Sequence, residues 1–273
     1  MVAAAMLAKA KRLAAPRLRA THSPLLDRLR ADPARLLTAA GMDPDPWQTG
    51  LLRSPSRASL LLCSRQAGKS TVAAALALRA LLLAPPALVL LLSPTLRQSG
   101  ELFLKVLTLY RALGRPVPSL RPRDNTLRLE LANGSRVISL PGTEGTIRGY
   151  SGAALLVIDE AARVEDGLYY SVRPMLAVSQ GALVCMSTPF GRRGWFYEEW
   201  RGGNPWDRVK VTAGQCPRIP AAFLEGERRA LGPRWFAQEY GCEFMEAAGA
   251  VFSGADIDAA LAAPVPVLEF PKG

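Results

Sequence analysis

The chain has 273 residues, of which 49% are hydrophobic, and its formal net charge is +11 at pH 7. This length and hydrophobicity allow a large buried core and exclude disorder over the whole chain. The excess of Lys and Arg favours a polyanionic partner such as nucleic acid, because basic side chains release counterions from phosphates. Solubility alone would also explain the charge. The 4 cysteines form no C-x-x-C pair, so no metal or redox motif is expected, and a reducing cytoplasm is the expected compartment.

Two segments could be mistaken for a membrane span or a targeting peptide. Residues 72–92 are very apolar, but Arg79 interrupts them and Pro85-Pro86 divides them, so a helix, a turn and a buried strand explain them better. The stretch before Asp27 is basic but has no long apolar region, which argues against a secretory signal. No membrane contact is therefore expected.

A first amphipathic helix is expected at residues 23–40. Ser23 is a suitable N-cap, and Pro24 occupies the first helical position, where an N–H would have no partner anyway. Pro33 is expected to kink this helix or to split it in two.

Apolar runs and helical patterns then alternate along the chain. Asn133-Gly134 separates two short runs and indicates a β-hairpin, because both turn positions need positive φ. The alternation predicts a mostly parallel α/β sheet flanked by helices. Strands are expected at 58–63, 88–92, 127–131, 136–140, 155–158, 182–186 and 208–211, with helices at 71–83 and 96–113 and helical periodicity returning through 234–244.

A phosphate-binding loop is expected between the first strand and the helix after it. The residues Cys63-Ser-Arg-Gln-Ala-Gly68-Lys69-Ser70 follow the pattern G-x-x-x-x-G-K-[ST], with Cys63 in place of the first glycine. In this pattern backbone N–H groups surround the phosphates, the lysine reaches the β- and γ-phosphates, and the serine holds Mg²⁺. An ordinary strand-to-helix turn is the alternative. The predicted nucleotide-binding residues of the loop are Ser64, Arg65, Gln66, Ala67, Gly68, Lys69, Ser70 and Thr71.

Two carboxylates follow a later apolar run. Residues 155–158 lead directly into Asp159 and Glu160, so a buried strand would deliver both to the edge of the sheet where ligands of open α/β sheets bind. We expect Asp159 to hold Mg²⁺ and Glu160 to act as the general base toward water. A strand that ends in two solvated acids is the alternative, but the loop upstream argues against it. The two motifs together predict a P-loop ATPase that uses ATP and Mg²⁺.

Further short motifs surround these two in a fixed order. Together with the early arginine of the loop, they make residues 45–252 resemble the ATPase domain of phage large terminase subunits, the motors that pump DNA into viral capsids. The motifs are Trp47-Gln48, Thr146-Ile-Arg148-Gly149, Ser187-Thr188-Pro189, and residues 236–244 followed by Val251-Phe252.

The resemblance implies roles for individual residues. Gln48 would recognise adenine and Arg65 would contact the γ-phosphate. Arg148 would act as an arginine finger on the ATP of a neighbouring subunit, the alternative being a structural arginine paired with an acid. Ser187 and Thr188 would sense the γ-phosphate and couple its loss to a lid, the alternative being a simple cap after the strand.

The resemblance also implies a P-loop NTPase fold of the RecA/ASCE type with a small helical C-terminal lid. The implied function is ATP hydrolysis that drives double-stranded DNA into a capsid. The implied partners are a capsid portal protein, a small terminase subunit and further copies of the chain in a ring, in the cytoplasm of a bacterial host and encoded by a phage or prophage. The expected parts are a basic N-terminal helical segment (1–45), the ATPase core (46–215), the helical lid (216–252) and a tail (253–273).

Two other functions stay open, and one activity is not expected. Full-length terminases of this kind continue into a nuclease domain, and only about 20 residues follow the resemblance here, too few for such a domain. Nuclease activity is therefore not expected from this chain. The alternatives to a motor are a truncated prophage remnant that binds ATP without productive packaging, and a helicase-like nucleic-acid-dependent ATPase, which would need a second lobe.

Basic and aromatic residues interleave late in the core. Such surfaces suit nucleic acid, because bases stack on aromatic rings while cations meet phosphates. The same aromatic residues would equally serve a core or an interface. They are Arg192, Arg193, Trp195, Phe196, Tyr197, Trp200, Arg201 and Lys210.

Overall fold

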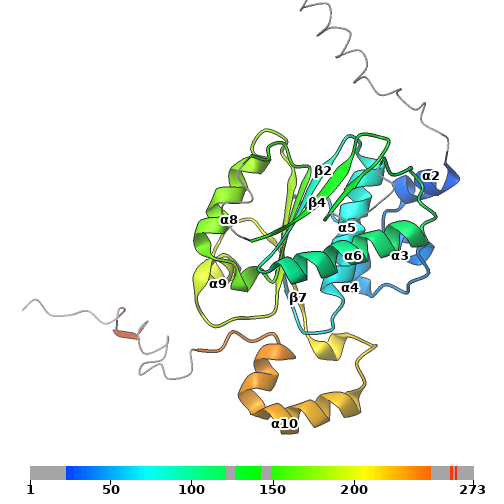
Figure 1. Ribbon diagram of the computed structural model, residues 1–273. Coiled ribbons are helices and arrows are strands. Elements are labelled where there is room, and N and C mark those ends of the chain that lie inside the picture. The colour runs from blue at the N-terminus through cyan, green and yellow to red at the C-terminus, as the bar shows by residue number, and fades with distance from the viewer. Residues whose placement is uncertain (1–22, 121–126, 143–148, 247–258, 261, 263–273) are drawn as a thin grey trace, which may run out of the picture.

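The computed structural model describes residues 23–120, 127–142, 149–246, 259, 260 and 262. Within these residues a 7-stranded sheet has the order β3-β4-β2-β5-β6-β1-β7 (Figure 1). β3 pairs antiparallel with β4, and the other neighbours pair in parallel, which confirms the predicted mostly parallel α/β sheet. The strands are β1 (Ala58–Cys63), β2 (Leu88–Ser93), β3 (Arg128–Glu130), β4 (Arg136–Pro141), β5 (Leu155–Asp159), β6 (Ala182–Ser187) and β7 (Asp207–Val211).

Helices cover both faces of this sheet, as Figure 1 shows for α5 and α6 on one side and α8 and α9 on the other. The side chains of each central strand point alternately into two separate apolar clusters, Leu61 and Leu91 into one, Leu60 and Leu90 into the other. Strands buried on both faces must be apolar throughout, which is why they stand out in the sequence. The helices are α2 (Pro24–Ala31), α3 (Arg35–Ala39), α4 (Pro46–Arg53), α5 (Lys69–Leu83), α6 (Leu96–Ala112), α8 (Asp166–Val172), α9 (Gly194–Arg201) and α10 (Ala221–Glu239).

The helix boundaries differ from the sequence-based expectations at two places. Pro33 separates α2 from α3, as expected. No helix was predicted over residues 46–53, but α4 begins at Pro46 because Asp45 and Gln48 form a reciprocal capping box. Helical structure was expected to continue to Phe244, but α10 ends at Glu239, where the N–H of Gly241 turns back to a carbonyl of the last turn.

The aromatic residues near position 195 were predicted either to stack on nucleic-acid bases or to belong to the core, and their positions in α9 distinguish the two. The Trp195 and Phe196 side chains are 3% and 1% exposed. Trp195 stacks on Tyr169 with ring centroids 3.8 Å apart, and its indole N–H donates to the carbonyl of Val164 at 3.0 Å. These two rings belong to the core, which leaves no room for bases to stack on them. No helix among the described residues is long and apolar enough to cross a membrane.

The parallel strands bring four chain segments to one edge of the sheet. β2, β5, β6 and β1 are successive neighbours, so their carboxyl ends lie side by side. The register places Ser187 of β6 opposite Leu62 of β1, and Asp159 of β5 opposite Met186 of β6. The loop predicted to bind phosphates, which follows β1, is therefore separated from the acidic pair after β5 by the single strand β6. α10 lies beyond this same edge, below the sheet in Figure 1.

Candidate active site

The loop between β1 and α5 turns sharply at two residues with positive φ. Gln66 has a φ of 60° and Gly68 a φ of 91°. Only glycine fits well at the second position, because a Cβ there would lie 2.6 Å from the side-chain nitrogen of Gln48. Helix α5 begins at Lys69, directly after this turn. The turn thus presents the positive end of α5, with partly exposed Ser70 and Thr71 in its first turn, at the carboxyl edge of the sheet.

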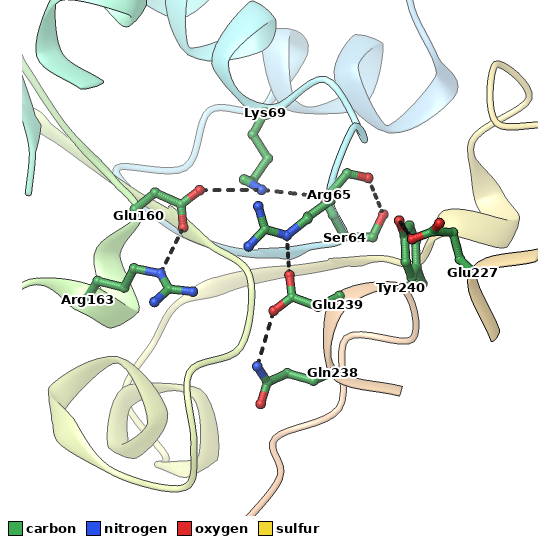
Figure 2. A network of polar contacts seen from close by, with 9 residues as sticks. All are labelled: Ser64, Arg65, Lys69, Glu160, Arg163, Glu227, Gln238, Glu239 and Tyr240. Atoms are coloured by element: carbon green, nitrogen blue, oxygen red, sulfur yellow. Dashed lines mark hydrogen bonds and ion pairs between the residues drawn. The ribbon is translucent and has the colours of Figure 1, made fainter. Parts of the chain in front are cut away.

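The loop lysine meets the carboxylate that follows β5 (Figure 2). The Lys69 side chain is 9% exposed, and its Nζ lies 3.9 Å from Oε1 of Glu160 and 3.4 Å from the carbonyl of Ser64. The other oxygen of Glu160 lies 3.9 Å from Nε of Arg163. Glu160 has a φ of 49°, an uncommon conformation for a residue with a side chain and one that recurs at functional sites.

Asp159 lies behind Glu160 in a buried position. Asp159 is 7% exposed, and its carboxylate accepts a hydrogen bond of 3.0 Å from the backbone N–H of Glu160. Burial raises the pKa of Asp159 to about 6, and the negative charge of Glu160 adds to this rise while Lys69 opposes it. A buried carboxylate whose charged form lacks solvation gains strongly from a nearby cation.

Two unpaired hydroxyls flank Asp159 in the sheet. Ser93 ends β2 and Ser187 ends β6, the two neighbours of β5. Both side-chain oxygens are buried, and neither has a hydrogen-bond partner among the described residues. The hydroxyl of Ser70 and the carboxylate of Asp159 are oxygen donors of the kind that Mg²⁺ prefers. Thr188, the second predicted coupling residue, is 2% exposed at the same edge.

The side chain of Gln48 is committed to contacts inside the protein. Its Oε1 accepts from the backbone N–H of Asp45 at 3.0 Å, and its Nε2 donates to the carbonyl of Gly68 at 3.3 Å. Gln48 is 3% exposed. This geometry gives Gln48 a role in holding the loop, and the recognition of adenine stays a prediction.

Two ion pairs at the loop were not predicted from the sequence. Arg65 forms an ion pair with Glu239 at the end of α10, and its backbone N–H donates to the Glu239 carbonyl at 3.1 Å. Arg218 holds both oxygens of Asp45, at 2.5 and 2.7 Å, and lies 3.4 Å from the carbonyl of Ala67. The partners are 174 and 173 residues apart, so no spacing rule could have linked them.

One predicted site residue cannot be located. Arg148, with Thr146 and Ile147, lies outside the described residues. Of the predicted set, the structure brings together the loop, Asp159, Glu160, Ser187 and Thr188 at one edge, with Gln48 behind the loop.

Known proteins with a similar sequence are terminases. The chain is 29% identical over 252 residues to "Terminase, large subunit" of Thermus virus P23-45, an alignment that covers 80% of this chain and 52% of the relative. It is 27% identical over 232 residues to the protein of the same name from Escherichia phage T5, with 80% and 51% covered. The chain thus spans about half the length of these curated relatives.

Solved structures with a similar fold, and the family model that matches the chain, are also those of large terminase subunits. The Thermus Phage P74-26 large terminase ATPase domain has a TM-score of 0.67 and 23% identity, with 77% of this chain and 97% of that chain covered. A large terminase from a thermophilic bacteriophage in complex with ATP-gamma-S has a TM-score of 0.56 and 15% identity, with 78% and 52% covered. These likenesses show a shared fold. The family model described as "Terminase large subunit, T4likevirus-type, N-terminal" matches residues 60–259, and the chain belongs to this family.

Proposed function

We propose that this chain is the ATP-hydrolysing motor domain of a viral DNA-packaging terminase. The observation that carries the proposal is the meeting of the buried Lys69 with Glu160, 3.9 Å apart, at the carboxyl edge of a mostly parallel sheet. A cationic side chain at a helix N-terminus suits a triphosphate, and a carboxylate beside it suits the activation of water. Membership of the terminase family supports the choice of DNA packaging over other uses of ATP.

The loop residues would bind the phosphates of ATP. The backbone N–H groups of residues 66–70 would surround the phosphates as in other phosphate-binding loops, and Lys69 would reach the β- and γ-phosphates. Arg65, whose side chain is 58% exposed, adds a second positive charge from the solvent side. Mg²⁺, held by Ser70 and Asp159, would supply further positive charge against the phosphate oxygens.

Glu160 would act as the general base. A water oxygen attacks the γ-phosphorus in line with the bridging oxygen to the β-phosphate, its proton passes to the Glu160 carboxylate, and the bond to the bridging oxygen breaks to release ADP. In the present structure this carboxylate interacts with Lys69 and Arg163. A triphosphate offers Lys69 a stronger partner, which leaves Glu160 available for water.

The product state would be passed to α10 and to the DNA. Ser187 and Thr188 lie between the loop and the acidic pair, where loss of the γ-phosphate would change their contacts directly. Arg65 connects the loop directly to Glu239 of α10. The remaining parts of the proposal are double-stranded DNA, a portal protein and a small terminase subunit as partners, a ring in which Arg148 serves a neighbouring site, and action in the host cytoplasm.

The test is Mg²⁺-dependent ATP hydrolysis by the purified chain, with and without duplex DNA. Glu160→Gln should lower the turnover rate by about 10²–10⁴-fold while ATP still binds, because only the proton acceptor is lost. Glu198→Gln, which removes the same charge from an exposed position on α9, should leave turnover unchanged. Equal turnover in wild type and Glu160→Gln would refute the assignment of the base.

The same assay separates the alternatives. ATP binding without turnover, even with duplex DNA and partner proteins present, would favour a remnant. Turnover accompanied by separation of the strands of a forked duplex would favour a helicase-like enzyme. Turnover stimulated by duplex DNA without strand separation supports the packaging motor.

A further inference from the structure

A cavity lies at the edge of the sheet opposite the candidate active site, where the parallel strands begin. A cavity of about 670 Å³ is lined by residues at the start of three parallel strands, among them Arg57, Leu155 and Ala182. The nucleotide-site residues follow the carboxyl ends of these same strands. The cavity is therefore separate from the site proposed for ATP.

The charged side chains that line this cavity are all cationic. Arg30, Arg57 and Arg79 line it together with several hydroxyl groups, and no Asp or Glu is among its described lining residues. Arg79, half-buried on α5, donates a hydrogen bond of 3.5 Å to the carbonyl of Ser54, and no described carboxylate forms an ion pair with it. Burial accordingly lowers the pKa of Arg79. A half-buried guanidinium without an anion is costly, and an anionic ligand would remove that cost.

A neighbouring cavity extends the same surface. It measures about 340 Å³, shares Arg57 and Gln180 with the first cavity, and adds Arg173 and Trp206. Its described lining again includes no acid. Arg57 lies at the junction of the two cavities, and no described carboxylate forms an ion pair with it.

Several carboxylates do contact lining residues, but they are not themselves among the lining residues of either cavity. Asp27 pairs with Arg30 at 2.8 Å and Asp207 accepts from the Ser54 hydroxyl at 3.0 Å. Glu199 lies 3.8 Å from Arg173 and accepts from the indole of Trp206 at 2.7 Å. These acids compensate Arg30 and Arg173, which leaves Arg57 and Arg79 as the cations open to a ligand.

The apolar part of the lining selects among anionic ligands. Leu51, Leu76 and Leu83 contribute to the wall of the larger cavity. Free phosphate has no apolar group, and the backbone of a DNA duplex presents mainly charged phosphates, whereas a peptide with alternating acidic and apolar side chains has both acidic groups and large apolar groups. The net charge of +11 disfavours a second copy of this chain as the donor of such a peptide. We infer that the two cavities joined at Arg57 form a docking site for an acidic, partly apolar peptide segment of a partner protein.

The probe for this inference is a short fluorescein-labelled peptide of alternating Asp and Leu, followed by fluorescence anisotropy against the full chain. The wild type should bind it, and Arg79→Gln and Arg57→Gln should each weaken binding by about tenfold, because each removes a charged hydrogen-bond donor. Arg229→Gln, which removes one charge from the exposed surface of α10, should change the affinity less than about twofold. Thermal unfolding of each variant shows whether the fold is intact.

Three outcomes would overturn the inference. The first is the absence of binding, or equal binding by all four proteins. The second is equal binding of a matched Asn–Leu peptide, since charge would then play no part. The third is displacement of the probe by duplex DNA or by inorganic phosphate, which would assign the arginines to nucleic acid or to a small anion.

Discussion

Individual residues at the loop are held in conformations that few side chains tolerate. Gly68 combines a φ of 91° with close contact to Gln48, so its place in the G-K-S motif has a steric reason. Glu160 adopts a φ of 49° directly after the buried Asp159. The carbonyl of Glu160 accepts a hydrogen bond of 2.8 Å from the N–H of Arg163, which stabilises this backbone turn, and the carboxylate lies 3.9 Å from Nζ of Lys69.

Gly68→Ala should damage the loop more than the backbone strain alone predicts. An alanine at positive φ costs roughly 1–2 kcal/mol, and here its Cβ would also lie 2.6 Å from the Gln48 side chain. Gly114→Ala is the matched control, because Gly114 has a φ of 73° and a Cβ there would meet nothing within 4 Å. Denaturant unfolding should show a larger loss of stability for Gly68→Ala than for Gly114→Ala, and binding of an ATP analogue should be at least about tenfold weaker only for Gly68→Ala.

Equal loss of binding in the two alanine variants would contradict this expectation. It would mean that binding follows the general loss of stability and not the contact with Gln48 at the loop. Intact binding in both would remove the loop from the nucleotide site altogether.

Residues within one short motif could be predicted from the sequence, and residues joined across the fold could not. The loop and the pair Asp159-Glu160 are recognisable because each is contiguous and follows a strand. Arg218 and Glu239 reach the loop from segments more than a hundred residues away, and only the folded chain shows that they meet Asp45 and Arg65. Their charges alone suggest no partner, since the chain has 34 basic and 23 acidic residues.

Strands and helices could be predicted from the sequence where burial dictates which residues they contain. The strands buried on both faces are continuous apolar runs, and the Asn133-Gly134 turn connects the antiparallel pair β3 and β4 as expected. Positive φ was expected at both turn residues, but only Gly134 has it, at 86°. The order of the strands was not predictable, because the insertion of β6 between β1 and β5 depends on crossovers that leave no local trace. That insertion is what places Ser187 and Thr188 between the loop and the acidic pair.

The N-terminal helices are attached to the core by a pH-sensitive ion pair. Both oxygens of Asp32, after α2, accept hydrogen bonds from Arg53 at the end of α4, at 2.9 and 2.8 Å. The Arg53 hydrogen bonds lower the pKa of Asp32 from 3.8 to about 2. Because the pKa in the folded state is the lower one, this stabilisation is complete above pH 3.8 and is lost as the pH falls through about 2.

Arg53→Gln should raise the pKa of Asp32 back toward 3.8, as measured by NMR titration of its carboxyl carbon. The variant should be less stable than the wild type at neutral pH, and this difference should shrink as the pH falls through about 2, because Asp32 becomes protonated in both proteins below that pH. Arg28→Gln provides the control, because the one hydrogen bond that the Arg28 side chain donates within the described residues goes to the carbonyl of Pro24. An unchanged Asp32 pKa in Arg53→Gln would show that other groups, such as Arg35, hold the carboxylate.

At the scale of the whole molecule, α10 lies apart from the sheet and presents much of its surface to solvent (Figure 1). Phe223, Leu231 and Trp235 are 49%, 39% and 58% exposed. α10 is also bent at Gly232-Pro233, where Gly232 has a φ of 72° and a ψ of 168°. A cavity of about 310 Å³ lies between this helix and Arg65, lined in part by Trp235 and Tyr240. Few apolar contacts therefore hold α10 against the rest of the molecule, so its position depends more on the polar contacts it makes with the loop.

The ion pair of Glu239 with Arg65 is expected to control how firmly α10 stays docked (Figure 2). Arg65 is 58% exposed, so water screens the pair and its loss should cost about 1 kcal/mol, or about fivefold in the opening equilibrium. Hydrogen–deuterium exchange of residues 221–240 should accordingly be about fivefold faster in Glu239→Gln, while β1, β5 and β6 keep their protection.

Glu225→Gln removes the same charge from an exposed position of the same helix and should leave exchange unchanged. If Glu239→Gln and Glu225→Gln exchanged at the same rate, the ion pair would not hold the helix. The backbone hydrogen bonds would then be the attachment, namely those from Arg65 to Glu239 at 3.1 Å and from Ala213 to Tyr240 at 2.9 Å. In that case a change at the phosphates could not reach α10 through the Arg65 side chain, and coupling would have to run through Ser187 and Thr188 instead.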